Sequence, residues 1–197
     1  MFAGHFGLAA ATKSQEPEIP LWALMLSTQL LDVLFVPLFI AGIETADAVP
    51  GAPSYGGSII HANYTHSLVG ALLISLIAGL LAARPWGRRG GLVIGGLVFS
   101  HWILDLLVHR ADLPILPGNA GNLPTLGFGL WAMPVVSAVL EAILVLGGGF
   151  LYYRAATALP TPPGGNRQAY HQRALLAATV TGLLLVLSLV ANVVGLV

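Results

Sequence analysis

The chain has 197 residues, of which 56% are hydrophobic and only 8% are charged, and eight Lys and Arg residues balance eight Asp and Glu residues. A mean hydropathy of +0.85 excludes an ordinary soluble domain and indicates a single integral membrane domain over residues 1–197. The zero net charge and the lack of a basic run argue against nucleic acid as a partner, and the absence of cysteine excludes disulfides and thiolate ligands.

The N-terminal residues, Met1 to Thr12, are mildly apolar but have no basic stretch ahead of them, so we expect a short helix there and no cleavable signal peptide. Five later segments are long and apolar enough to cross a bilayer, which takes about 20 residues each. In chain order they are approximately Leu21 to Ile43, Tyr64 to Ala83, Gly91 to His109, Leu130 to Tyr153 and Ala174 to Val197. The predicted fold class is therefore all-α, a polytopic membrane helical bundle of about five transmembrane helices plus the short N-terminal helix.

Basic residues near the segment ends predict the orientation. One side of the predicted membrane receives Lys13, Arg84, Arg88, Arg89, Arg154, Arg167 and Arg173, and the other side receives only Arg110. Because basic residues concentrate on the cytoplasmic side of membrane proteins, we expect a cytoplasmic N-terminus and a C-terminus on the outside.

Three ionisable residues share one face of the third segment. His101, Asp105 and His109 are spaced at i, i+4 and i+8, which places their side chains on one side of a helix among apolar neighbours. An ionisable group inside a membrane costs several kcal/mol unless it is paired, so three together predict a common partner, most simply a metal ion. A carboxylate between two histidines can also bridge two ions, an arrangement that suits hydrolysis.

Other segments add nitrogen and oxygen donors of the kind that zinc and manganese accept. The complete set of candidate ligands is His5, Asp32, His66, His101, Asp105, His109 and Glu141. We therefore expect these side chains to surround two divalent ions, with zinc as the first candidate and manganese as the second.

Several short motifs resemble those of a known family. They are His5-Phe6-Gly7, Gln29-x-x-Asp32, Thr65-His66-Ser67, Ser100-His101-Trp102-x-x-Asp105 and Gly127-x-Gly129-x-Trp131. These motifs resemble bacterial inner-membrane proteins described as membrane-bound metal-dependent hydrolases, the YdjM-like group, which is distantly similar to the zinc-dependent phospholipase C and P1 nuclease superfamily. The resemblance covers the chain up to about the fourth segment. It implies a multi-pass protein of the bacterial cytoplasmic (inner) membrane.

The resemblance also implies roles for individual residues. The first metal would be held by Asp32, His66, His101 and Asp105, and Asp105 would be the bridging carboxylate that also meets His5. The soluble enzymes have a His-x-x-x-Glu motif. In this chain Ser137, not a histidine, stands four residues before Glu141. Residues also precede His5, whereas those enzymes use a free N-terminal amino group as a ligand. A centre of two metals is therefore the expectation.

Together these features predict a membrane-embedded metal-dependent hydrolase, acting on a phosphoester or related ester of a lipid or amphipathic substrate through water activated by the ions. Asp105 and Glu141 are the catalytic candidates, and Glu141 would position that water. One alternative is a transporter that passes divalent ions or protons along the same His and Asp residues, although the chain lacks the paired halves of many transporters. A non-catalytic membrane scaffold is another.

Some candidates have a structural interpretation that the sequence leaves open. His101 and Asp105 could be a buried hydrogen-bonded pair that holds helices together. His5 could lie on an amphipathic helix at the membrane surface. Glu141 could pair with a neighbouring Ser or His, and His109 could be a solvated residue at a helix end. The sequence predicts neither the substrate nor the oligomeric state.

Overall fold

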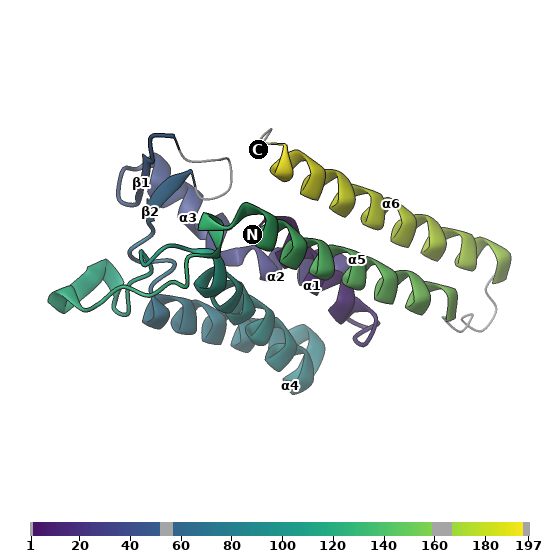
Figure 1. Cartoon of the computed structure of the whole chain (residues 1–197). Coiled ribbons are helices and arrows are strands. Elements are labelled where there is room, and N and C mark those ends of the chain that lie inside the picture. The colour runs from purple at the N-terminus through teal and green to yellow at the C-terminus, as the bar shows by residue number, and fades with distance from the viewer. Residues whose placement is uncertain (1, 52–56, 159–166, 195–197) are drawn as a thin grey trace.

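The structure is a computed structural model that describes residues 2–51, 57–158 and 167–194 (Figure 1). It is mostly helical, as expected, and adds a small antiparallel sheet that the sequence did not predict. The elements are α1 (Phe2–Lys13), α2 (Leu21–Thr28), α3 (Leu30–Ile40), β1 (Thr45–Ala48), β2 (Ser58–His61), α4 (Leu68–Val108), the 3-10 helices η1 (Pro117–Asn122) and η2 (Leu130–Ala132), α5 (Pro134–Ala158) and α6 (Arg167–Val193).

Three of the described helices, α4, α5 and α6, are long and apolar enough to cross a membrane. Helices α2 and α3 pass the same test only as a pair, bent by 54° at Gln29, so there are up to four candidates by length and composition. The expected count of about five is not confirmed by this criterion, because most of the predicted second and third segments lies within the 41 residues of α4.

Helix α4 doubles back on itself at Gly87. This residue has φ of 66° and ψ of −179°, a conformation that glycine adopts without steric cost. The two halves then pack through small residues, because a Cβ atom added to Gly79 would lie 2.8 Å from the carbonyl oxygen of Gly91. Likewise, a Cβ atom on Gly95 would lie 3.0 Å from the carbonyl oxygen of Ser75. The end of α4 therefore returns to the end of the molecule where α4 begins.

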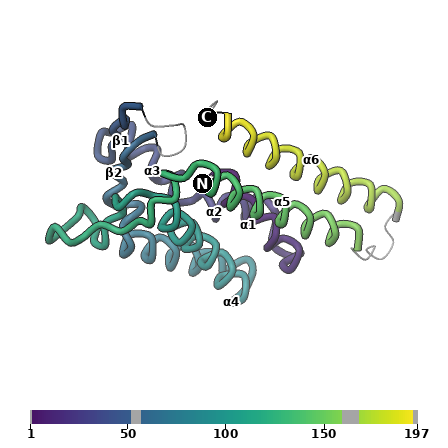
Figure 2. The backbone as a smooth tube through the Cα atoms, viewed as in Figure 1, coloured from purple at the N-terminus to yellow at the C-terminus, as the bar shows by residue number. Residues whose placement is uncertain are grey.

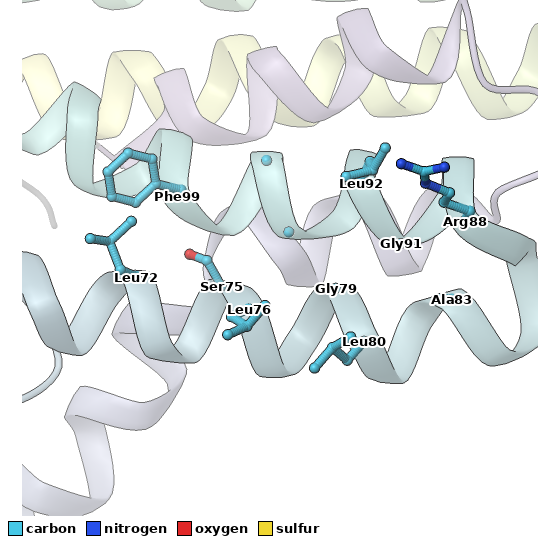
Figure 3. Close-up of a pocket in the computed structure, with 12 residues that line it drawn as sticks. Leu72, Ser75, Leu76, Gly79, Leu80, Ala83, Arg88, Gly91, Leu92 and Phe99 are labelled. Carbon is cyan, nitrogen blue, oxygen red and sulfur yellow. The ribbon is translucent and has the colours of Figure 1, made fainter.

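A groove with a volume of about 500 Å³ lies between the two halves of α4 (Figure 3). Leucine side chains and Phe99 line it, and Arg88 lies at one end. None of the residues that line this groove is a His, Asp or Glu. The groove is therefore separate from the candidate metal ligands.

Helix α1 is buried inside the bundle. Ala3 is fully buried and His5 is only 1% exposed. The helix lies close against α5, since a Cβ atom on Gly148 would lie 2.7 Å from the carbonyl carbon of Gly7. The interpretation of α1 as an amphipathic helix at the membrane surface is therefore wrong, because its small residues allow it to pack between other helices.

The two strands form a hairpin at the end of the bundle where α4 begins and ends. Thr45 pairs with His61 in an antiparallel register, and the His61 ring lies 3.0 Å from the Asp47 carboxylate. The backbone N–H of Ile60 donates to Asp112 Oδ2 at 3.1 Å, which attaches the hairpin to the segment after α4. Figure 2 shows the strands at one end of the bundle and the end of α5 at the other.

Candidate metal centre

Five of the predicted ligands come together at the end of the bundle near the hairpin. Two overlapping groups of the described residues have donor atoms within 4.8 Å of one another. His5, His101 and Asp105 form the first group, and Asp32, His66 and His101 form the second. Helix α1 contributes His5, α3 contributes Asp32, the turn before α4 contributes His66, and the second half of α4 contributes the other two.

The donor atoms of four residues have closely similar spacings. His66 Nε2 lies 3.3 Å from His101 Nε2 and 3.4 Å from Asp32 Oδ1, and His101 Nε2 lies 3.5 Å from Asp32 Oδ1. Asp105 Oδ2 lies 3.0 Å from His101 Nε2 and 3.6 Å from His66 Nε2. Ligands bound tetrahedrally to zinc at about 2.0–2.1 Å lie about 3.3 Å from one another. The three spacings among Asp32, His66 and His101 therefore fit ligands of one ion, and Asp105 Oδ2 lies at similar distances from the two histidines.

The other ring nitrogens of His66 and His101 have hydrogen-bond partners outside this group. His101 Nδ1 lies 2.7 Å from the carbonyl oxygen of Thr28, and His66 Nδ1 lies 2.8 Å from Thr65 Oγ1. A carbonyl oxygen only accepts, so neutral His101 carries its proton on Nδ1 and directs the lone pair of Nε2 towards the other donors. Such an outer partner is typical of histidines that bind metals.

Asp105 connects the two groups through its two oxygens. Oδ1 lies 3.1 Å from His5 Nε2, whereas Oδ2 faces His101 and His66. The His5 ring stacks on the His101 ring with centroids 3.9 Å apart. The pKa of His5 is lowered to about 4, mainly by burial. Its imidazole is therefore neutral at pH 7 and can offer a lone pair. Asp105 is thus placed as a carboxylate that can bridge two ions.

His109 lies at the edge of the centre and in neither group. Its Nε2 is 3.8 Å from Asp105 Oδ2, and its Nδ1 is 3.0 Å from Asp112 Oδ1. The side chains of His109 and Asp112 are at most 7% exposed. The interpretation of His109 as a solvated residue is wrong, because the following loop folds back over it. The backbone N–H of Gly129 donates to the His109 carbonyl at 2.7 Å. The centroids of the His109 and Trp131 rings are 4.2 Å apart.

Glu141, predicted as a ligand or as the residue that positions water, also belongs to neither group of donors. Its side chain is fully buried. Oε1 accepts a hydrogen bond from the backbone N–H of Gly4 at 3.0 Å, and Oε2 accepts one from Asn192 Nδ2 at 3.1 Å. These contacts connect α5 to α1 and α6, and they hold the residue next to His5.

The sequence reasoning missed Glu44, which lies between α3 and β1. Its side chain is fully buried, and its carboxylate accepts hydrogen bonds from the residues just before His66. A signal was available, since Glu44 is one of only eight acidic residues in the chain and adjoins a predicted span.

A scan against protein-family models, a search of curated proteins and a search of solved structures each gave no match to this chain. The resemblance drawn from the short motifs therefore stays a prediction, and a functional assignment has to rest on the geometry of the site.

Proposed function

We propose that the protein is a membrane-embedded metal-dependent hydrolase that acts on a phosphoester or related ester of a lipid or amphipathic substrate. The observation that supports this most strongly is the spacing of 3.3–3.5 Å among the donor atoms of Asp32, His66 and His101, with Asp105 Oδ2 within 3.6 Å of both histidines. In this proposal a cation lies among these converging nitrogen and oxygen atoms, because carboxylates in a largely buried site are costly without a charged partner. A divalent ion is the cation that this set of nitrogen and oxygen donors suits best.

In this proposal those four residues hold the first ion. His5 and Asp105 Oδ1 contribute to a second ion, and His109 lies close enough to assist after a small side-chain movement. Zinc is the expected metal and manganese the alternative. When bound, such ions lower the pKa of water towards 7 and stabilise negative charge on a leaving oxygen. Asp105 fixes the relative placement of the two ions, and Glu141 holds α1 so that His5 reaches the site.

The exposure of the ligands supports an apolar substrate. The Asp32 side chain is 41% exposed, whereas those of His5, His66, His101 and Asp105 are at most 5% exposed. The open edge of the centre is therefore at α3. Exposed apolar residues adjoin Asp32 on this helix, including Val33 at 47% and Val36 at 52%. A molecule that approaches here meets an apolar surface next to the centre, which suits a lipid or an amphipathic ester.

We further propose that the chain crosses a bacterial inner membrane five times, with the Lys13 end of α1 on the cytoplasmic side and the His5 end of α1 inside the bundle. The reversal at Gly87 supports counting the two halves of α4 as separate spans. Arg89 near this reversal forms an ion pair of 2.7 Å with Glu16, which places the segment after α1 at the same end. With that end in the cytoplasm, as its basic residues favour, the metal centre lies towards the outer side of the membrane.

Purified protein in nanodiscs tests the proposal. Wild-type protein loaded with zinc or manganese should hydrolyse a phospholipid or a soluble phosphodiester, and Asp105→Asn should abolish turnover. Asp47→Asn is the matched control, because Asp47 carries the same side chain in the exposed hairpin and should leave turnover unchanged. Metal flux into liposomes without turnover would instead establish the transporter, and absence of both bound metal and turnover would leave the scaffold.

A further inference from the structure

We infer that Glu44 is a positioning residue that fixes which nitrogen of His66 carries the proton. Glu44 Oε1 accepts hydrogen bonds from the backbone N–H groups of Tyr64 at 2.8 Å and Thr65 at 2.9 Å. The hydroxyl of Thr65 lies 2.9 Å from Glu44 Oε2 and 3.2 Å from Oε1. Among the described residues, these hydrogen bonds connect Glu44 to the metal centre through Thr65 and not through a ligand.

The hydroxyl of Thr65 has a single proton to share between two neighbours. A carboxylate can only accept, so this proton is donated to Glu44. Thr65 Oγ1 then accepts a hydrogen bond from His66 Nδ1, which lies 2.8 Å away. Neutral His66 consequently carries its proton on Nδ1, and Nε2 keeps a lone pair.

The direction of this hydrogen-bond chain decides whether His66 can bind a cation. His66 Nε2 faces His101 Nε2 at 3.3 Å and Asp32 Oδ1 at 3.4 Å. With the opposite direction, Thr65 would donate to Nδ1 and the His66 proton would occupy Nε2, the atom that points into the centre. A nitrogen that carries a proton is not a ligand. Glu44 thus does for His66 what the Thr28 carbonyl does for His101. The inference rests on the proposed metal centre and extends it to a residue outside the ligand set.

The substitution Glu44→Gln keeps the shape of the side chain and reverses the hydrogen-bond chain. The amide oxygen still accepts from the two backbone N–H groups, but the amide nitrogen replaces Oε2 and donates to Thr65 Oγ1. The hydroxyl proton of Thr65 is then free to be donated to His66 Nδ1. Thr65→Val provides a second variant, because it removes the hydroxyl and retains the backbone contacts with Glu44, whereas Thr65→Ser should preserve the wild-type behaviour.

Nitrogen NMR of ¹⁵N-histidine-labelled, metal-free protein in nanodiscs reports the tautomer directly, with the His66 signal assigned by its loss in His66→Ala. We expect the Nδ1-protonated form in wild type and in Thr65→Ser, and a shift towards the Nε2-protonated form in Glu44→Gln. Zinc titration should show about 10- to 100-fold weaker binding for Glu44→Gln, as for other outer partners of metal ligands. Asp47→Asn, in the hairpin that follows Glu44, should match wild type in both measurements.

An unchanged His66 tautomer in Glu44→Gln would overturn the inference, whatever the zinc affinity. The two measurements also separate this inference from the proposed function. A tautomer change without any zinc binding by the wild type would support the role of Glu44 and contradict the metal centre. Tight zinc binding by the wild type, with the same His66 tautomer in wild type and Glu44→Gln, would support the metal centre and contradict the role of Glu44.

Discussion

Helix α1 delivers His5 to the metal centre, and its docking on α5 depends on Gly148. In Gly148→Ala the new Cβ atom would overlap the carbonyl oxygen of Gly7 and lie 2.7 Å from its carbonyl carbon. Ordinary contacts between carbon atoms are about 3.5–4.0 Å, so α1 has to move away from α5 by at least about 1 Å. This movement separates His5 Nε2 from Asp105 Oδ1, which are now 3.1 Å apart. We expect a stability loss of about 1–3 kcal/mol from overpacking and, because misplacement by about 1 Å can cost about 100-fold in rate, a comparable loss of turnover.

The neighbouring glycine supplies a matched control for this experiment. A Cβ atom on Gly147 meets nothing within 4 Å, so Gly147→Ala makes the same chemical change on the same helix without moving α1. Alanine also has the higher helix propensity, by about 1 kcal/mol. Gly148→Ala should lower the unfolding temperature, followed by tryptophan fluorescence, together with the bound metal and the turnover. Gly147→Ala should maintain all three. Equal stability and metal content in the two variants would refute the argument that α1 docking positions His5.

Further predictions concern the metal and the groups that anchor the helices. A chelator should lower the unfolding temperature of wild type but not of His101→Ala, since ligand present at 100 times its Kd stabilises a protein by about 2.7 kcal/mol; equal shifts in both would contradict specific binding. Glu141→Gln should lose about 1–3 kcal/mol in denaturant unfolding, because its amide nitrogen faces a donor at Gly4 or Asn192. Glu16→Gln removes an ion pair with an exposed arginine and should cost no more than about 1 kcal/mol, with unchanged metal content.

The part of the site that could be predicted from the sequence is the part that local geometry determines. His101 and Asp105 are one helical turn apart, and the structure places His101 Nε2 3.0 Å from Asp105 Oδ2. The convergence of His5, Asp32 and His66 with them depends on how distant segments pack. These residues could be grouped from the sequence because ionisable residues in apolar surroundings need partners and because the motifs resemble those of a metal-dependent family. Their role as metal ligands stays a prediction.

The fold shows the same division between local and long-range information. The helical character followed from long apolar segments, whereas the close packing of the two halves of α4 through their glycines was found in the structure. The bend between α2 and α3 was not predicted, because nothing in the residues around Gln29 is a strong helix breaker. Strand β1 was also missed, since all four of its residues are exposed and lack an apolar alternation; its structure comes from pairing with β2.

Glu44 and Glu141 illustrate why acidic residues were the hardest to assign. Both are fully buried, and both accept hydrogen bonds from backbone N–H groups of distant segments. The donor is Tyr64 for Glu44 and Gly4 for Glu141. A carboxylate that accepts backbone hydrogen bonds and one that binds a metal look alike in a sequence. Only the packing of the surrounding segments separates them.

The central claim is that side chains from distant segments converge around shared cations, and elemental mass spectrometry of the purified protein tests it most directly. Wild-type protein prepared without chelators should contain stoichiometric zinc or manganese. His101→Ala should lose it, while His61→Ala, which alters a histidine of the exposed hairpin, should retain it. Metal content near zero in the wild type, or equal content in wild type and His101→Ala, would contradict the account.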